Sequence, residues 1–179
     1  MIPAIAQTLA RILADGTSLS GTEEIDFNPP SRTLIGKTGL TVYCYNIREN
    51  SQTLLESCRG GACNEPLSVH PELDVLRWFD VSFVVSAWDS TALGEQQLLS
   101  EALSSLLHHR YLQRDILPPE LQPYERLPFV ISPIPAIDPV MLWSSLGLPL
   151  RPALYVTVTI PIVPHAKPPP LECVISTSL

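Results

Sequence analysis

The chain has 179 residues, enough for one domain with a full hydrophobic core, whereas two domains would each be small. Its formal net charge is −7 and no two basic residues are adjacent, so the positive surface that a nucleic-acid binder needs is missing. No apolar stretch approaches the length of a membrane span, and the N-terminal segment lacks the basic start of a signal peptide. We therefore expect a cytosolic protein that binds no nucleic acid and inserts into no membrane.

The first part of the chain predicts one helix and two strands. Residues 2–14 carry apolar side chains at helical spacing: Ile5, Ala6, Leu9, Ile12 and Leu13. A short strand over 23–27 closes at the Asn-Pro-Pro sequence of 28–30, because two prolines cannot continue a central ladder. Residues 40–48 are rich in β-branched and aromatic side chains and form the second predicted strand.

Residues 49–77 are polar and irregular, and we predict a long loop insertion there. Cys58 and Cys63, together with His70, supply three possible zinc ligands, but the spacing is wide and no fourth ligand is apparent. A disulfide within the loop and two unconnected thiols are the alternatives. The other two cysteines are expected to be free thiols, as is usual in the cytosol.

The segment from Trp78 to Leu112 changes its hydrophobic period once, which predicts one strand that leads into one helix. The strand is expected to be half-buried, with one apolar and one polar face: Phe79, Val81, Phe83, Val85 and Ala87 against Asp80, Ser82 and Ser86. The helix has a buried stripe of Leu98, Leu99, Ala102, Leu103, Leu106 and Leu107, and a solvent face of Glu95, Gln96, Gln97, Glu101 and Ser105. N-cap candidates lie between the two: Asp89, Ser90 and Thr91. The corner contains no phosphate-loop or nucleophile motif, which favours a role in packing.

The next segment predicts a brief edge strand over 127–131 and a short helix that Asp138 caps and Gly147 ends. The buried stripe of that helix is expected to be Val140, Trp143 and Leu146. Residues 153–160 form the last core strand, with an apolar and a more polar face: Leu154, Val156, Val158 and Ile160 against Tyr155, Thr157 and Thr159.

Prolines then predict an extended arm over 163–179, so that the folded domain comprises residues 1–162. The arm ends in a β-prone segment whose apolar residues are the candidate partner-binding residues: Leu171, Cys173, Val174 and Ile175. Such a segment is suited to docking as an added strand on a neighbouring subunit or a sheath protein. The alternative is an ordinary disordered terminus.

Three other groups of residues suggest a function, and each also has a structural interpretation. His108, His109 and Arg110 end the long helix, where cations favour the helix dipole, and adjacent histidines do not point the same way as a metal pair would. Tyr43 and Tyr45 form either a stacking platform or, as the net charge favours, a core or subunit contact. The carboxylates have no recurring spacing: Asp74, Asp80, Asp89 and Asp115. We predict no catalytic, cofactor-binding or metal-binding residue.

Several of these pieces, in this order, resemble one protein family. They are LARIL, DFNPPSR, LTVYCYNIRENSQ, FDVSFVVSAWDSTALGEQQLLSEALSSLL and LPLRPALYVTVTIPI. The recurring features are a strand that ends in Phe-Asn-Pro-Pro, a strand followed by Arg-Glu-Asn, a long strand that leads into a helix with Glu95, and a step into the last strand at Arg151 and Pro152. Together they are similar to the N-terminal domain of the cap, or tail-terminator, proteins of extracellular contractile injection systems, the phage-tail-like particles of the antifeeding-prophage and virulence-cassette type. The cysteine-bearing insertion from Leu54 to Val69 and the proline-rich arm have no counterpart in this pattern.

The resemblance implies an α+β fold of the phage tail-terminator type, with a small mixed β-sheet flanked by helices. It also implies a structural, non-enzymatic subunit that forms a ring, expected to be a hexamer, without a cofactor. Its partners would be the inner tube and sheath proteins, and its place the distal end of a particle assembled in the cytoplasm. The rival interpretations are a small-molecule or metal-binding protein or enzyme that uses the 49–77 loop, and a soluble adaptor without a capping role.

Overall fold

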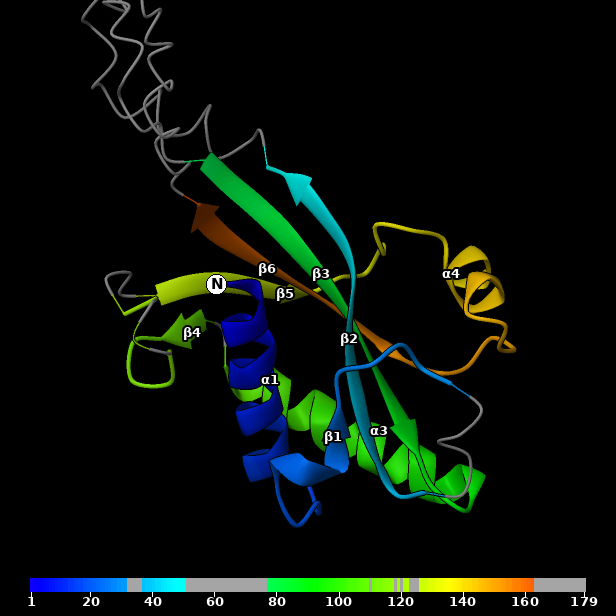
Figure 1. Cartoon of the computed structure of the whole chain (residues 1–179). Helices are drawn as coiled ribbons and strands as arrows, with labels where there is room; N and C mark the ends of the chain where they lie inside the picture. Colours follow the sequence, from blue (N-terminus) through cyan, green and yellow to red (C-terminus); the bar gives the residue numbers. More distant parts are fainter. Residues whose placement is uncertain are drawn as a thin grey trace, which may run out of the picture.

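A mixed sheet of six strands, in the order β1-β2-β3-β6-β5-β4, forms the centre of the described structure (Figure 1). The computed structural model describes residues 1–31, 37–50, 77–109, 111–117, 119, 121–122 and 126–162. The strands are β1 (Ile25–Asp26), β2 (Gly39–Glu49), β3 (Arg77–Trp88), β4 (Tyr111–Gln113), β5 (Arg126–Ile131) and β6 (Leu154–Ile162). The helices are α1 (Ile2–Gly16), the 3-10 turn η1 (Thr22–Glu24), α3 (Ala92–His108) and α4 (Pro139–Ser145). β1 pairs with β2 in parallel and the other neighbours pair antiparallel, which confirms the predicted mixed sheet and α+β class.

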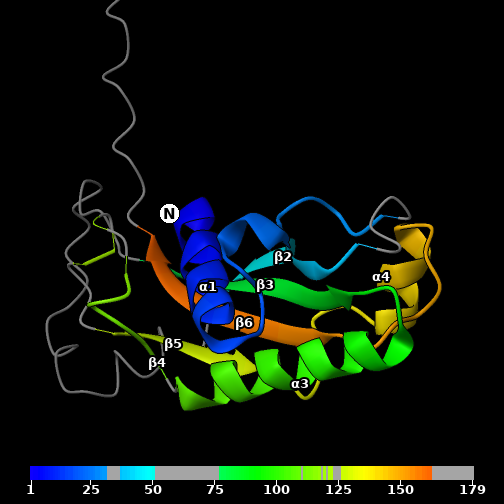
Figure 2. The same ribbon diagram turned by 90° about the horizontal axis from the view of Figure 1, so that it is seen from below.

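The main core lies between one face of the sheet and the two longer helices, α1 and α3. Figure 2 shows these helices close together, with α4 set apart from them. Side chains from both helices and from the central strands have almost no exposure to solvent: Ile5, Leu9, Leu13, Val81, Phe83, Val85, Leu98, Ala102, Leu106, Val156 and Val158. The hydroxyl of Ser105 on α3 donates a hydrogen bond of 2.8 Å to the carbonyl oxygen of Ile12 on α1. The predicted packing of the first helix and the strand-to-helix unit is therefore confirmed.

The corner between β3 and α3 is closed by side-chain hydrogen bonds. The Thr91 hydroxyl accepts a bond of 3.0 Å from the backbone N–H of Gly94, so Thr91 is the N-cap that the sequence predicts. The Asp89 carboxylate accepts bonds of 3.0 Å from the backbone N–H of Thr91 and from the hydroxyl of Thr38, just before β2. A Cβ at position 94 would lie 2.2 Å from an Asp89 oxygen, so a larger residue there would displace the Asp89 side chain from these hydrogen bonds.

Asp89 should make the stability of the protein depend on pH. Hydrogen bonds from the Thr91 backbone and then from the Thr38 hydroxyl hold the pKa of Asp89 below its ordinary value. A lowered folded-state pKa adds stability that is fully present above the unfolded pKa, about 3.9, and is lost as the pH falls through the folded value. We therefore expect Asp89→Asn to destabilise the protein at neutral pH, and the difference from wild type to shrink below about pH 4. Denaturant titrations at a series of pH values measure it; a difference that stays constant with pH would contradict the assignment.

A second, smaller core lies on the other face of the sheet, where α4 packs against the strands. It contains Val84, Trp88, Leu142, Trp143 and Leu148, with partly buried tyrosines around them. The indole N–H of Trp143 donates a bond of 3.1 Å to the hydroxyl of Tyr155 on β6. Gly147 ends the helix with a φ of +70°, as the predicted glycine stop requires.

This second core corrects the expectation that β3 is half-buried. Its polar face is buried too, because β3 is a central strand: Asp80, Ser82 and Ser86 all have little exposure. The Ser82 hydroxyl lies 3.3 Å from the Thr157 hydroxyl, whereas the buried Ser86 hydroxyl has no hydrogen-bond partner within the described structure. The Asp80 carboxylate accepts bonds of 2.8 Å from the Asn50 amide and from the Thr159 hydroxyl. The alternation of apolar and polar residues along a strand predicts which side chains are buried only when one face of the sheet is in contact with water.

The predicted buried stripes of α3 and α4 contain errors. Leu107 is 65% exposed and Leu103 is half-buried, because the buried stripe is narrower than predicted and consists of Leu98, Ala102 and Leu106, four residues apart. In α4, Val140 is exposed and Leu142 takes the buried place. Three predicted solvent-facing residues of α3 have distant partners instead. Ser105 bonds to α1, Glu101 accepts a bond of 2.8 Å from the backbone N–H of Ser18, and Glu95 forms an ion pair with Arg151.

Several predicted strand positions also change. The strand expected over 23–27 is reduced to Ile25–Asp26, because the preceding residues form η1. β5 lies between β6 and β4, so the segment predicted as an edge strand is internal, and the three residues of β4 were not predicted. β6 continues two residues beyond 160, through Pro161, because this end of β6 pairs with β3 only and the missing N–H of proline can face the free side.

Candidate assembly surface

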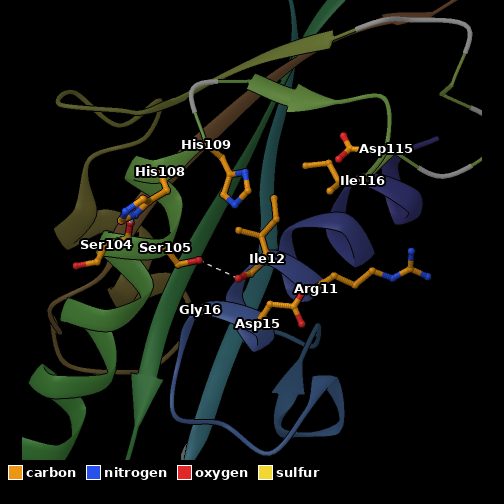
Figure 3. Close-up of a pocket in the computed structure, with 10 residues that line it drawn as sticks. All are labelled: Arg11, Ile12, Asp15, Gly16, Ser104, Ser105, His108, His109, Asp115 and Ile116. Atoms are coloured by element: carbon orange, nitrogen blue, oxygen red, sulfur yellow. Dashed lines mark hydrogen bonds between the residues drawn. The ribbon is translucent and has the colours of Figure 1, made fainter.

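Several titratable side chains surround a surface cavity of about 480 Å³ between the ends of α1 and α3 (Figure 3). Its lining includes Arg11 and Asp15 from α1, His108 and His109 from the end of α3, and Asp115. Figure 3 shows the His109 ring turned toward α1, whereas the His108 ring lies over α3. The His108 Nδ1 lies 2.7 Å from the carbonyl oxygen of Ser104.

The two histidines thus follow the structural interpretation, since His108 is in the last turn of α3 and His109 is its C-cap. Arg110 lies outside the described residues. Within the described ranges no group of three or more histidine, cysteine or acidic side chains could hold a metal ion, and no helix is long and apolar enough to cross a membrane. The cavity therefore offers a polar surface without an evident reactive group.

The two tyrosines of β2 belong to the second core. Tyr43 and Tyr45 are half-buried beside α4, and the Tyr45 ring meets the Tyr155 ring edge-on with 6.2 Å between centroids. Burial raises the pKa of Tyr45 above its ordinary value. The predicted core role is confirmed, and no open stacking platform remains on this part of β2.

The acidic residues that sequence analysis singled out are not brought together. Asp80 and Asp89 lie near opposite ends of β3, and Asp115 follows β4 at the cavity. Asp74, the loop residues Cys58, Cys63 and His70, and the candidate partner-binding residues all lie outside the described residues; the last are Leu171, Cys173, Val174 and Ile175.

Surfaces suited to contacts with other proteins are more evident than a reactive site. Large exposed apolar side chains come from the segment that carries α4, and sequence analysis did not identify them as a surface: Ile134, Val140, Met141 and Leu150, between 55% and 85% exposed. Side chains of this size left in water are typical of regions that associate with other proteins. A second candidate is the outer edge of β2, where Phe27 and Ile47 are 43% and 49% exposed.

One structural cluster joins features that the sequence had shown only separately. The Arg151 guanidinium lies 4.1 Å from the centroid of the Trp88 ring and pairs with the Glu95 carboxylate, 56 residues away in the chain. The Trp88 indole N–H donates a bond of 2.8 Å to the Thr41 hydroxyl on β2. This cluster holds the start of α3 against the end of β3 and the residues that lead into β6. It explains why Arg151 before the last strand and Glu95 in the long helix occur together in the sequence pattern.

The family model described as the Pvc16 N-terminal domain matches residues 4–177, almost the whole chain. The chain belongs to this family. The match confirms the predicted resemblance, and it extends past β6 into the proline-rich segment that the sequence pattern had left without a counterpart. No curated protein gives a match.

Two solved structures share the fold of this Pvc16 N-terminal domain. One is the sheath/tube terminator of an extracellular contractile injection system, PVC, in the extended state, with a TM-score of 0.65 and 18% identity over 93% of this chain. The other is the tube-terminating cap of the anti-feeding prophage, with a TM-score of 0.55 and 19% identity over 99% of this chain. Both were determined by cryo-EM, and this chain spans 57% and 59% of their lengths. The terminator-type fold is therefore established.

Proposed function

We propose that the chain is a structural subunit that caps the tube and sheath of a contractile injection particle and stops their growth. The observation that carries this proposal is the Pvc16 N-terminal domain match over residues 4–177, together with the fold that the chain shares with a sheath/tube terminator and a tube-terminating cap. The proposed place is the end of the particle distal to the baseplate. The proposed partners are the inner tube protein, the sheath protein and further copies of the chain.

A cap of this kind should be a ring, with a hexamer as the proposed size. A terminator has to match the rotational symmetry of the tube it closes, and head-to-tail contacts give a closed ring only when their rotation closes. Such contacts join two different surfaces of each subunit. The described residues offer two candidate contact surfaces, the outer edge of β2 and the exposed apolar side chains around α4.

A non-enzymatic role agrees with how the described charged groups are used. Arg151 and Glu95 hold α3 to the strands, Asp80 is bonded inside the sheet, and Asp89 closes a turn. These side chains stabilise the fold and face no shared cavity. Metal bound to the purified protein would favour the rival interpretation, in which the 49–77 loop forms a binding site.

Co-assembly with the partner proteins tests the proposed function. Light scattering should show little association of the purified chain at low concentration and a ring-sized species once tube or sheath subunits are added. Negative-stain images should show tubes of limited length with the chain present, and longer, irregular tubes without it. A chain that stays monomeric with both partners, and leaves tube length unchanged, would contradict the proposal.

A further inference from the structure

Among the residues that the structure describes, the outer edge of β2 pairs with another strand only at its start. β1 pairs only with Leu40 and Thr41, so the backbone of Val42–Glu49 is open on the side away from β3 throughout the described structure. The loop and turn hydrogen bonds between described backbone groups include none to this edge. An open edge of this length is a template for another strand, and proteins that keep one usually cover it.

An apolar pocket of about 330 Å³ lies beside this edge. Its walls include Ile2 and Ala6 of α1, Phe27, and the β2 side chains Val42 and Cys44. The pocket is therefore on the helix face of β2, where an added strand would place every second side chain.

The exposed apolar residues continue this face along β2. The register of β2 against β3 shifts between Cys44 and Asn46, and this bulge returns Ile47 to the face of the pocket. Ile47 is 49% exposed and Phe27 is 43% exposed. An added strand with alternating apolar side chains would cover both, together with the open backbone.

Segment 171–179 has the pattern that this edge requires. Its residues alternate between an apolar set, Leu171, Cys173 and Ile175, and a more polar set that contains Glu172. The family match extends to residue 177, fifteen residues past the end of β6, so most of this segment lies within the matched domain. Glu172 is its only charged residue, and Arg48, which is 62% exposed, is the only cation of β2.

The topology also places the segment within reach of such an edge. β2 and β6 are both antiparallel to β3, and the pairs Glu49 with Phe79 and Ile162 with Arg77 put the ends of both strands at the same end of the sheet. The eight residues of 163–170 include four prolines and span roughly 25 Å when extended at 3.1 Å per residue.

We propose that segment 171–179 of one copy adds as a strand to the β2 edge of a neighbouring copy. Its apolar side chains then lie over the apolar pocket that Phe27, Val42 and Cys44 line. The contact is head-to-tail, because the arm and the edge are different surfaces of the subunit. This inference deepens the proposed capping function and rests on the ring that the function requires. It also proposes a docking site, the β2 edge, for the segment that contains the candidate partner-binding residues: Leu171, Cys173, Val174 and Ile175.

Cross-linking between two different full-length variants tests this contact. The first variant carries a single thiol on β2, either Cys44 or, in a chain without Cys44, the more exposed probe Ile47→Cys. The second variant keeps only Cys173, and all other cysteines are changed to serine. A thiol cross-linker with a reach of about 10 Å, two strand spacings, is added to the mixture at alkaline pH. The alkaline pH is needed because burial raises the pKa of the Cys44 thiol.

We expect a cross-linked heterodimer, roughly tenfold above a control, because docking raises the local thiol concentration into the millimolar range. The matched control moves the probe to α3, as Leu107→Cys in a chain without Cys44, since Leu107 is exposed and lies on another element. Equal cross-linking in the control, or no cross-linking at all, would overturn the proposal. A third variant that keeps both Cys44 and Cys173 would overturn it too if it cross-links only within its own chain. Light scattering of the same samples separates the docking contact from the capping function. If rings form but the cross-link does not, the docking contact is wrong and the proposed capping function still stands.

Discussion

Phe83→Ala should lower the free energy of unfolding by about 3–5 kcal/mol. Phe83 lies in the middle of the central strand β3, has no solvent exposure, and belongs to the core beneath α1 and α3. Truncation removes most of an aromatic side chain and leaves a cavity between the sheet and the two helices that cover it. Urea or thermal unfolding, followed by circular dichroism, measures the change.

Leu107→Ala is the matched control for Phe83→Ala. Leu107 is 65% exposed, so its truncation should change the unfolding free energy by no more than about 0.5 kcal/mol. The sequence alone predicts a large effect for Leu103→Ala too, but Leu103 is half-buried and we now expect less than for Phe83→Ala. Equal effects for Phe83→Ala and Leu107→Ala would mean that the buried face is assigned wrongly.

The parts of the fold that local pattern encodes could be predicted. The change from period two to helical period at Asp89 to Thr91 defined both β3 and α3, because strand alternation and helix capping depend on residues close in sequence. The same is true of α4, where an aspartate cap and a glycine stop lie nine residues apart. Such local signals fix where an element begins and ends.

Long-range pairing limited the prediction of the rest. The sequence of β5 is short and contains a proline, which suggested an edge, but β4 pairs with it and makes it internal. Three core leucines between α3 and β5 were missed because they follow no helical or strand period: Leu112, Leu117 and Leu121. The polar face of β3 is buried by α4 and by neighbouring strands. The sequence of β3 itself does not encode these distant contacts.

The candidate contact surfaces were predictable only in part. The apolar alternation of segment 171–179 is visible in the sequence, whereas the edge proposed to receive it is not. That edge exists because β1 is two residues long and β2 is eleven, a mismatch that appears only once the strands are paired. The α4 surface was hidden for a related reason, since Val140 was assigned to the interior.

Arg151→Ala should destabilise the protein by about 2–3 kcal/mol. The Arg151 side chain is 17% exposed and that of Glu95 is 24% exposed, so the pair is screened less than a surface salt bridge. Truncation removes the guanidinium that lies over Trp88 and leaves the Glu95 carboxylate partly buried without its cation. Arg151→Lys keeps the charge but loses the planar stacking, and should cost about 1 kcal/mol.

A double-mutant cycle separates the ion pair from the stacking. Glu95→Gln and Arg151→Met alone should each be destabilising, and the double variant should lose less than the sum of the two, with a coupling of about 1 kcal/mol. Because α3 begins one turn before Glu95, loss of this contact should also loosen the start of the helix, which hydrogen exchange at its first amides would detect. Additive effects, with unchanged exchange at the start of α3, would show that the contact contributes nothing to holding the helix on the sheet.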